Sequence, residues 1–153
     1  MRFLILISLS IILALPAQAE NKAPYSGTKV MQTGKPFAGY LNSLKSAIRS
    51  NKMGIVSIAC ATCGAKAIGV TIPGNRVIMI YNPHFAVRML KASVEAGVEA
   101  PLRLYVTENI DGTAKLSYRL PSHVFAPYDI AALNTMAKEL DTIVTKIISD
   151  AGK

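Results

Sequence analysis

The chain has 153 residues, of which 51% are hydrophobic, and it carries a formal net charge of +8 with only two cysteines. This length suits one domain with a sizeable core, and no low-complexity linker or internal repeat divides it. The lysines and arginines are scattered rather than interleaved with aromatic residues, which argues against nucleic acid as a partner. The positive charge instead indicates a solvated outer face, with anionic surfaces or acidic small molecules as the partners it would attract.

The start of the chain has the pattern of a secretory signal peptide. Arg2 supplies the positive charge, an apolar run follows at residues 3–15, and Ala17-Gln18-Ala19 predicts cleavage before Glu20. The apolar run is shorter than the about 20 residues that a transmembrane helix needs. Removal of 19 of the 153 residues would leave 134, and loss of Arg2 would lower the formal charge from +8 to +7. We therefore predict a signal peptide at 1–19, a single domain at 20–153, no transmembrane segment after cleavage, and a periplasmic or secreted protein.

A strand and a helix are predicted next. Residues 25–32 indicate a short strand, and the Thr-Gly-Lys-Pro motif at 33–36 is a helix-start signal. The apolar residues that follow recur at helical spacing with basic residues on the other side, which is typical of a helix packed on a core. The apolar stripe consists of Phe37, Tyr40, Leu41, Leu44, Ala47 and Ile48.

Two further strands are predicted at residues 53–59 and 66–72, because both segments are rich in Ile and Val and alternate in part. Between them lies Cys60-Ala61-Thr62-Cys63-Gly64. We expect an antiparallel hairpin whose tight connection carries both cysteines.

The pair Cys60 and Cys63 allows several interpretations. A structural disulfide comes first, because exported proteins are oxidised, although so short a loop adds little stabilisation. Two thiolates would also suit copper(I) or zinc, with His84 or His123 completing the ligand set. Thiol–disulfide exchange normally places the first cysteine at a helix N-terminus, whereas this pair is predicted between strands. Two free thiols are the remaining alternative, and we expect no cofactor unless copper or zinc binds here.

The middle of the chain combines a turn, a strand and a capped helix. The Pro-Gly pair at 73–74 is typical of a type II turn with positive φ at the glycine. The apolar run at 77–81 indicates an interior strand, and Asn82 followed by Pro83 is a strong helix start. The helix is expected to end near Gly97.

The corner formed by Asn82 and His84 has two interpretations. The first is a structural cap beside a surface histidine. The second is a ligand corner, since the N-terminus of a helix presents unpaired N–H groups that attract anions. The corner has no glycine-rich loop, so the structural cap is favoured.

The last third of the chain predicts a hairpin and a closing helix. An Asp-Gly turn at 111–112 separates two alternating segments, at 102–107 and 115–120. His123 follows in an irregular crossing and is expected to be a surface residue. Asp129 is predicted to cap the final helix, which has the clearest apolar stripe of the chain.

The predicted order is therefore strand, helix, three strands, helix, two strands, helix. Short turns join successive strands, so the sheet should be mostly antiparallel. Each helix has one apolar face, so the helices should cover one side of the sheet. This is an α+β two-layer sandwich.

Several motifs resemble one protein family. They are Ile80-Tyr81-Asn82-Pro83 before an apolar helix, Ala100-Pro101-Leu102-Arg103-Leu104-Tyr105-Val106-Thr107-Glu108, Asp111-Gly112 and Leu116-Ser117-Tyr118. Together they resemble the family called domain of unknown function 302, from about residue 25 to about residue 147. The resemblance implies a small α/β domain with an antiparallel sheet, often dimeric, and it implies no established reaction and no catalytic residues. The cysteine pair is not a general feature of that family.

The sequence contains no Gly-x-Ser-x-Gly, His-Glu-x-x-His or phosphate-loop motif. We therefore expect a non-enzymatic, exported module that forms a homodimer and binds a small apolar or anionic ligand, or interacts with a partner. The alternative is a thiol-based redox or soft-metal protein that uses Cys60 and Cys63.

Overall fold

The computed structural model describes residues 26–153, so the predicted signal peptide at 1–19 and the start of the predicted first strand, Tyr25, lie outside the described residues. Ten helices and strands make up this part of the chain, together with the two 3₁₀ helices η1 and η2. In chain order the elements are β1 (Thr28–Pro36), α1 (Phe37–Ser50), β2 (Gly54–Ala59), α2 (Ala61–Ala67), β3 (Asn75–Tyr81), α3 (Pro83–Ala92), η1 (Glu95–Glu99), β4 (Leu102–Glu108), β5 (Thr113–Arg119), α4 (Pro121–Phe125), η2 (Ala126–Tyr128) and α5 (Ala131–Gly152).

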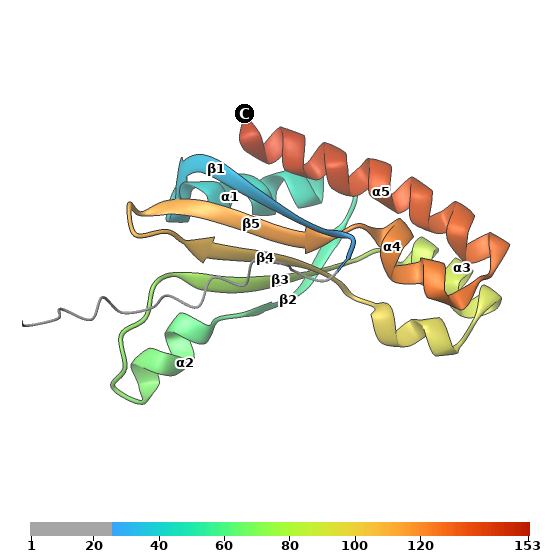
Figure 1. Ribbon diagram of the computed structural model, residues 1–153, viewed down its shortest axis with the longest axis horizontal. Helices are drawn as coiled ribbons and strands as arrows, with labels where there is room; N and C mark the ends of the chain where they lie inside the picture. Colours follow the sequence, from blue (N-terminus) through green and yellow to red (C-terminus); the bar gives the residue numbers. More distant parts are fainter. Residues whose placement is uncertain (1–25) are drawn as a thin grey trace, which may run out of the picture.

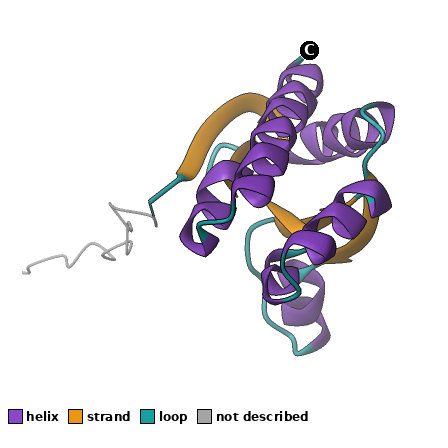
Figure 2. Ribbon diagram, turned by 90° about the vertical axis from the view of Figure 1, so that its right-hand side faces the viewer, coloured by secondary structure: helices purple, strands orange, loops and turns teal. Residues whose placement is uncertain are grey.

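The five strands form one antiparallel sheet in the order β1-β5-β4-β3-β2. The long helix α5, which ends at the C-terminus, runs across the sheet in both Figure 1 and Figure 2. It packs on α1, α3 and α4, and α1 in turn contacts four of the five strands. The predicted α+β class with a mostly antiparallel sheet is therefore confirmed. None of the helices in the part described is long and apolar enough to cross a bilayer.

The core lies between the sheet and these helices. Alternate residues of the central strands point toward the helices and are buried, as the period of two in a strand requires. On β3, β4 and β5 these residues are Ile78, Ile80, Leu104, Val106, Ala114 and Leu116. The helices cover them with a second buried set, which includes Tyr40, Leu44, Ile48, Phe125, Leu133, Met136, Leu140, Val144 and Ile147. Each large apolar side chain buried in this way stabilises the fold by about 1.5–3 kcal/mol relative to an exposed one.

The hairpin between β4 and β5 confirms the predicted Asp-Gly turn. Gly112 has φ +79, a left-handed conformation that favours glycine. The carboxylate of Asp111 accepts hydrogen bonds from the hydroxyl and the backbone N–H of Thr113, at 2.6 and 3.0 Å. Both bonds lower the pKa of Asp111, and the bond from the hydroxyl has the larger effect. The turn fixes the register of the two strands, which matters for the site described below.

The prediction of a strand at residues 66–72 is wrong. The chain instead forms the short helix α2 and then an exposed loop. The sheet therefore has five strands rather than the six that were predicted. Three of the seven residues of α2 are alanine, the best helix former, and no residue of α2 is buried. Figure 1 shows α2 beyond the end of the sheet and away from the other helices. The Ile and Val residues that suggested a strand therefore lie on a projecting segment without a partner strand in the described sheet.

Three smaller predictions are also corrected. Gly74 does not have positive φ, so it is not the third residue of a type II turn. It is buried instead, and a Cβ there would lie 2.5 Å from the ring of Phe37. Asp129 has φ +51 and follows η2, whereas Ile130 is the N-cap of α5. The helix expected to reach Gly97 ends at Ala92.

Candidate functional site

One face of the sheet is not covered by helices. Side chains there alternate with the core set, and several are exposed, including Val30 at 53% and Tyr105 at 37%. A groove of about 460 Å³ lies at the end of this face, which is within the size range of small-molecule sites. Its wall includes residues of β1, β4 and β5, together with η1 and the residues before β4.

Two arginines are the main charged groups of this groove. Arg103 on β4 and Arg119 on β5 both line it, and both are exposed. In the β4–β5 ladder Leu104 pairs with Tyr118, so the next step of the ladder sets Arg103 directly opposite Arg119. On its other side Arg119 pairs with Thr28 of β1. Like charges at directly opposite positions of a sheet destabilise it, so the pair has an energetic cost in the free protein.

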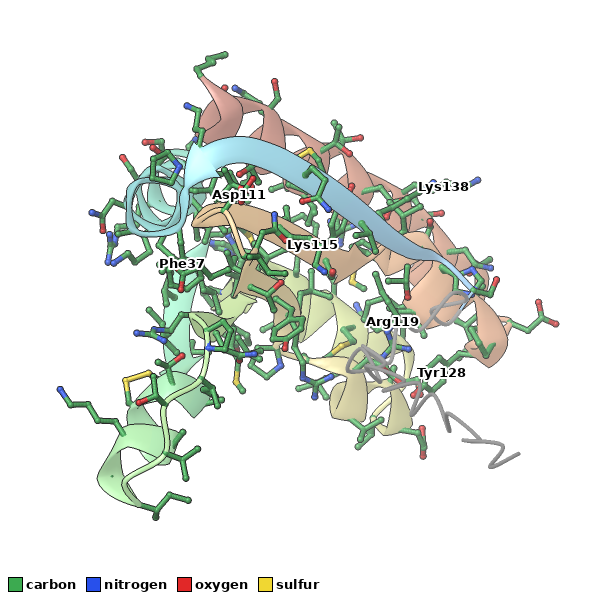
Figure 3. All side chains as sticks on the ribbon, turned by 60° about the vertical axis from the view of Figure 1, so that its left-hand side comes forward. Phe37, Asp111, Lys115, Arg119, Tyr128 and Lys138 are labelled. Carbon is green, nitrogen blue, oxygen red and sulfur yellow. A yellow bond between two sulfur atoms is a disulfide. The ribbon has the colours of Figure 1, made fainter. Side chains whose placement is uncertain are left out.

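The arginine pair is not neutralised within the described chain. The ion pairs of residues 26–153 use Arg88, Lys146 and Lys153 as their cations. Glu99 also lines the groove and brings one negative charge to it, but it forms no ion pair with either arginine, and its carboxylate accepts a hydrogen bond of 3.4 Å from the hydroxyl of Tyr128. Lys115 lies on the same strand as Arg119, as Figure 3 shows, and adds to the positive charge of the open face.

Neutral donors surround the arginines. The hydroxyl groups of Thr28, Ser117 and Tyr105 all belong to residues that line the groove. The Tyr105 oxygen accepts a hydrogen bond of 2.6 Å from the Asn75 side chain, so its own proton remains free to donate. Burial, with a further contribution from Asp141, raises the pKa of Tyr118, which favours the protonated phenol. The groove therefore combines two cations with several hydroxyl donors.

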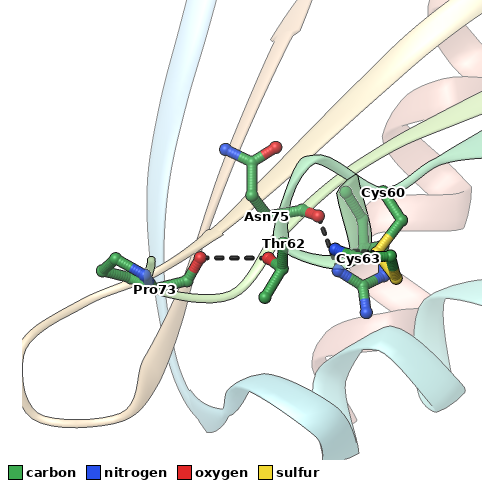
Figure 4. Close-up of a disulfide and its surroundings, with 6 residues drawn as sticks. Cys60, Thr62, Cys63, Pro73 and Asn75 are labelled. Atoms are coloured by element: carbon green, nitrogen blue, oxygen red, sulfur yellow. Dashed lines mark hydrogen bonds between the residues drawn. A yellow bond between two sulfur atoms is a disulfide. The ribbon is translucent and has the colours of Figure 1, made fainter. Parts of the chain in front are cut away.

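The cysteine pair lies on another part of the molecule. Cys60 and Cys63 form a disulfide with their Cα atoms 5.2 Å apart. Cys60 is the N-cap of α2, and its sulfur accepts a hydrogen bond of 3.0 Å from the backbone N–H of Cys63. Figure 4 shows this disulfide beside Thr62, whose hydroxyl donates to the carbonyl of Pro73 at 3.1 Å. The sequence-based expectation that the pair sits in a strand-to-strand turn is thus wrong, and the first cysteine does precede a helix.

The structure does not bring the two histidines to the cysteines. Cys60 follows β2, at the end of the ladder where Ala59 pairs with Val77, whereas His84 follows the opposite end of β3. His123 lies on α4, near the start of β1. Among residues 26–153 no three His, Cys, Asp or Glu side chains are grouped closely enough to hold a metal ion. Copper or zinc at the cysteines remains a prediction without a histidine ligand to support it.

Asn82 is a structural cap, as the favoured interpretation expected. Its side-chain oxygen accepts from the N–H of His84 at 2.9 Å, and its amide nitrogen donates to the carbonyl of Lys52 at 2.9 Å. Both ends of the amide are therefore used inside the protein. His84 is exposed and makes no side-chain hydrogen bond in the described part of the chain.

Sequence reasoning missed the arginine pair, because it treated Arg103 and Arg119 only as the polar side of two alternating strands. A signal was present. Both residues are eight positions from Asp111, so a hairpin centred on that turn places them opposite each other. The partner strand β1 and the groove beside the pair could not be read from the local pattern.

Two comparisons relate the chain to known proteins, and a third finds no match. Residues 28–151 match the model of the family described as domain of unknown function DUF302. A crystal structure of an uncharacterised conserved DUF302 protein from Bacillus stearothermophilus has the same fold, with a TM-score of 0.74 at 16% identity over 82% of this chain and 98% of that one. No curated protein matches the chain. Since the family model spans most of the sequence, this protein belongs to the family of domain of unknown function DUF302.

Proposed function

We propose that this protein is a non-enzymatic binding module whose groove holds a small ligand with a carboxylate or phosphate group. The observation that carries the proposal is the pair of opposed arginines, Arg103 and Arg119, in a groove of about 460 Å³. A sheet that sets two cations opposite each other gains stability when an anion binds between them. An anion is therefore the ligand that this arrangement favours.

The chemistry of the groove suggests what the ligand looks like. A guanidinium presents several N–H donors in a plane, which matches the two oxygens of a carboxylate or phosphate. The hydroxyls of Thr28, Tyr105 and Ser117 add further donors around the same space. Pro101 and Leu102 also line the groove and supply an apolar wall. We therefore infer a ligand that joins an acidic head to an apolar body.

The leader sequence supports export, so this binding would take place in the periplasm or outside the cell. Release of the mature protein before Glu20 is the corresponding proposal for processing. Export also fits the disulfide, because disulfides persist in oxidising compartments.

Replacing either arginine by glutamine is expected to weaken the binding of an apolar carboxylate such as benzoate at least tenfold. The reason is that a hydrogen bond to a charged group contributes about 1.5–3 kcal/mol, and tenfold corresponds to about 1.4 kcal/mol. Titration calorimetry of Arg103→Gln, Arg119→Gln and the parent protein measures the change, with inorganic phosphate as a second probe. Arg49→Gln is the matched control, since Arg49 is exposed on α1 and away from the groove.

The same two variants should be more stable than the parent when no ligand is present. Removing one of two opposed charges relieves a repulsion of about 0.2–1 kcal/mol, which chemical denaturation can resolve. Loss of binding together with unchanged or higher stability separates a binding role from a structural one. Equal weakening by Arg49→Gln would show that only the net charge matters, and the proposal would then be wrong.

We also propose that the protein forms a homodimer through β2. This strand is at the edge of the sheet, and its sequence Gly-Ile-Val-Ser-Ile-Ala has no charged residue that would discourage edge pairing. Val56 and Ile58 are 53% and 41% exposed on it. Two copies related by a twofold axis can pair β2 antiparallel and cover these side chains.

A charge on the edge strand is expected to prevent this association. Ile58→Lys should convert a dimer into a monomer at micromolar concentration, because a lysine on both sides of a twofold axis brings like charges together. Size-exclusion chromatography with light scattering gives the mass directly. Val87→Lys is the control, since Val87 is 67% exposed on α3. A parent protein that is monomeric, or a Val87→Lys variant that also dissociates, would refute the β2 interface.

A further inference from the structure

We propose that the Cys60–Cys63 disulfide is a thiol–disulfide exchange site that accepts electrons from dithiol substrates, with Cys63 as the sulfur attacked and Cys60 as the leaving group. This goes beyond ligand binding at the arginine groove and uses other residues. Its substrate class is a compound or polypeptide with two thiols that can close into a disulfide.

The disulfide contributes little to the architecture. It joins residues that are already held together, because the backbone N–H groups of Cys63 and Gly64 both donate to the carbonyl of Cys60 at 3.1 Å. It closes a very short loop, for which the expected stabilisation is at the low end for disulfides. The helix α2, which starts directly after Cys60, has no buried residue. A role in holding the core together therefore does not explain the bond.

The residue that carries the attacked sulfur is exposed. Cys63 is an exposed residue, and its neighbours Ala61 and Gly64 are exposed as well, whereas Cys60 is only partly exposed. The helix α2 projects beyond the sheet in Figure 1, so large thiol substrates can approach it. Thiolate attack needs a line of approach to one sulfur, and access is one of the factors that select which sulfur reacts.

The leaving sulfur is placed where a negative charge is favoured. The N–H of Cys63 already points at the sulfur of Cys60, at 3.0 Å. Continuing the β2–β3 ladder by one residue beyond Ala59 and Val77 sets Cys60 opposite Arg76. Arg76 takes part in no ion pair among residues 26–153. One of its nitrogens donates to the carbonyl of Asn75 at 2.7 Å, and its guanidinium carbon lies 6.0 Å from the centroid of the Phe37 ring. A guanidinium on the facing residue and a backbone donor both favour a thiolate, and a better-stabilised thiolate leaves faster.

The proposed reaction consists of two thiol–disulfide exchange steps. The first substrate thiolate attacks the sulfur of Cys63, a substrate–Cys63 disulfide forms, and the Cys60–Cys63 bond breaks with its electron pair on Cys60. The second substrate thiolate then attacks the substrate sulfur of that mixed disulfide, and the electron pair leaves on Cys63. Protons lost by the two substrate thiols end on the two protein thiols through solvent. The substrate gains a disulfide and loses two electrons, and the protein disulfide is reduced.

The test compares the folded protein with a ten-residue peptide that contains the same Cys-Ala-Thr-Cys segment. Dithiothreitol is the probe dithiol, and quenched samples are analysed for free thiols by mass. The folded protein should be reduced at least tenfold faster than the oxidised peptide at pH 7. With reduced glutathione as the probe, the trapped mixed disulfide should be on Cys63 in peptide mapping.

Variants of Arg76 separate electrostatic assistance from simple exposure. Arg76→Gln should slow reduction several-fold, and Arg76→Lys should restore most of the rate because it keeps the charge. Arg49→Gln is the control for net charge and should leave the rate unchanged. Circular dichroism of each variant confirms that the fold is retained, and Cys60→Ser and Cys63→Ser supply the two single-thiol references for mapping.

Three results would overturn the proposal. The first is a folded protein that reacts no faster than the peptide, as an inert structural disulfide would. The second is glutathione attached to Cys60 rather than Cys63. The third is an Arg76→Gln variant that matches Arg49→Gln in rate while remaining folded.

Discussion

Phe125→Ala is expected to lower the free energy of unfolding by about 3–5 kcal/mol, the usual cost of removing a buried aromatic side chain. Phe125 is 2% exposed, and it lines a small cavity together with Met89 of α3, Met136 and Leu140 of α5 and residues of the sheet. Its removal would leave a void lined by side chains from several elements that cannot close together. A domain of this size is stable by about 5–15 kcal/mol, so the variant should lose a large part of its stability.

Equilibrium denaturation with urea measures this loss as a change in midpoint. Val98→Ala serves as the control, because Val98 is 72% exposed and surface changes usually stay within about 0.5 kcal/mol. A loss below 1 kcal/mol for Phe125→Ala would mean that α4 does not close this end of the core.

Tyr40→Phe is expected to act in the opposite direction and to stabilise the protein by about 1–3 kcal/mol at neutral pH. Tyr40 is 0% exposed on α1, and its hydroxyl has no hydrogen-bond partner among the described residues. A buried hydroxyl without a partner carries a desolvation cost that phenylalanine does not have. The ring itself is kept, so the packing of α1 on the sheet should be unchanged.

The same hydroxyl makes stability depend on alkaline pH. Burial, with a smaller contribution from Tyr118, raises the pKa of Tyr40 to about 12 from 10.0. Between these values the unfolded chain loses the proton while the folded protein keeps it, so the folded state binds more protons. The contribution to stability is therefore complete below pH 10 and is lost as the pH rises toward 12.

The difference in stability between Tyr40→Phe and the parent should grow by about 1.4 kcal/mol between pH 8 and pH 11. Denaturation curves of both proteins at the two pH values give this number. The two proteins differ only at residue 40, so contributions from the rest of the chain cancel in the difference. A difference that is constant with pH would show that Tyr40 is not buried as described.

Local chemistry predicted much of the fold. The Asp-Gly turn and the Asn-Pro helix start depend on a few adjacent residues, and both occur where expected. The apolar stripe of α5 also predicted its buried face, because a long helix with one apolar side has only one way to pack. The α+β class follows from these elements together.

Two errors have a common physical cause. Residues 66–72 have strand-forming side chains, but a strand needs a partner, and this segment has none in the described sheet. Asp129 has the side chain of a helix cap, but the tight 3₁₀ turn before it places it in a left-handed conformation. In both cases the tertiary context outweighed the local preference.

The candidate site was less predictable than the fold. Cys60 and Cys63 were evident from spacing, whereas their position at the start of a helix depends on where β2 ends. The groove of Arg103 and Arg119 depends on strand register and on β1, whose partner strand β5 lies about eighty residues further along the chain. Register is a non-local property, so a pattern within one strand could not show it.

The projecting connection between β2 and β3 has a consequence for how this domain can be modified. Residues 61–73 place no side chain in the core, and the two strands that they join are already antiparallel neighbours. Closing a longer loop at such a point costs only about 0.6 kcal/mol for each doubling of its length. A short turn or a foreign peptide can therefore replace this segment, with loss of α2 and Cys63, while the sheet and the other helices stay intact. The connection between β2 and β3 is thus a site at which the domain should tolerate an insertion or a replacement.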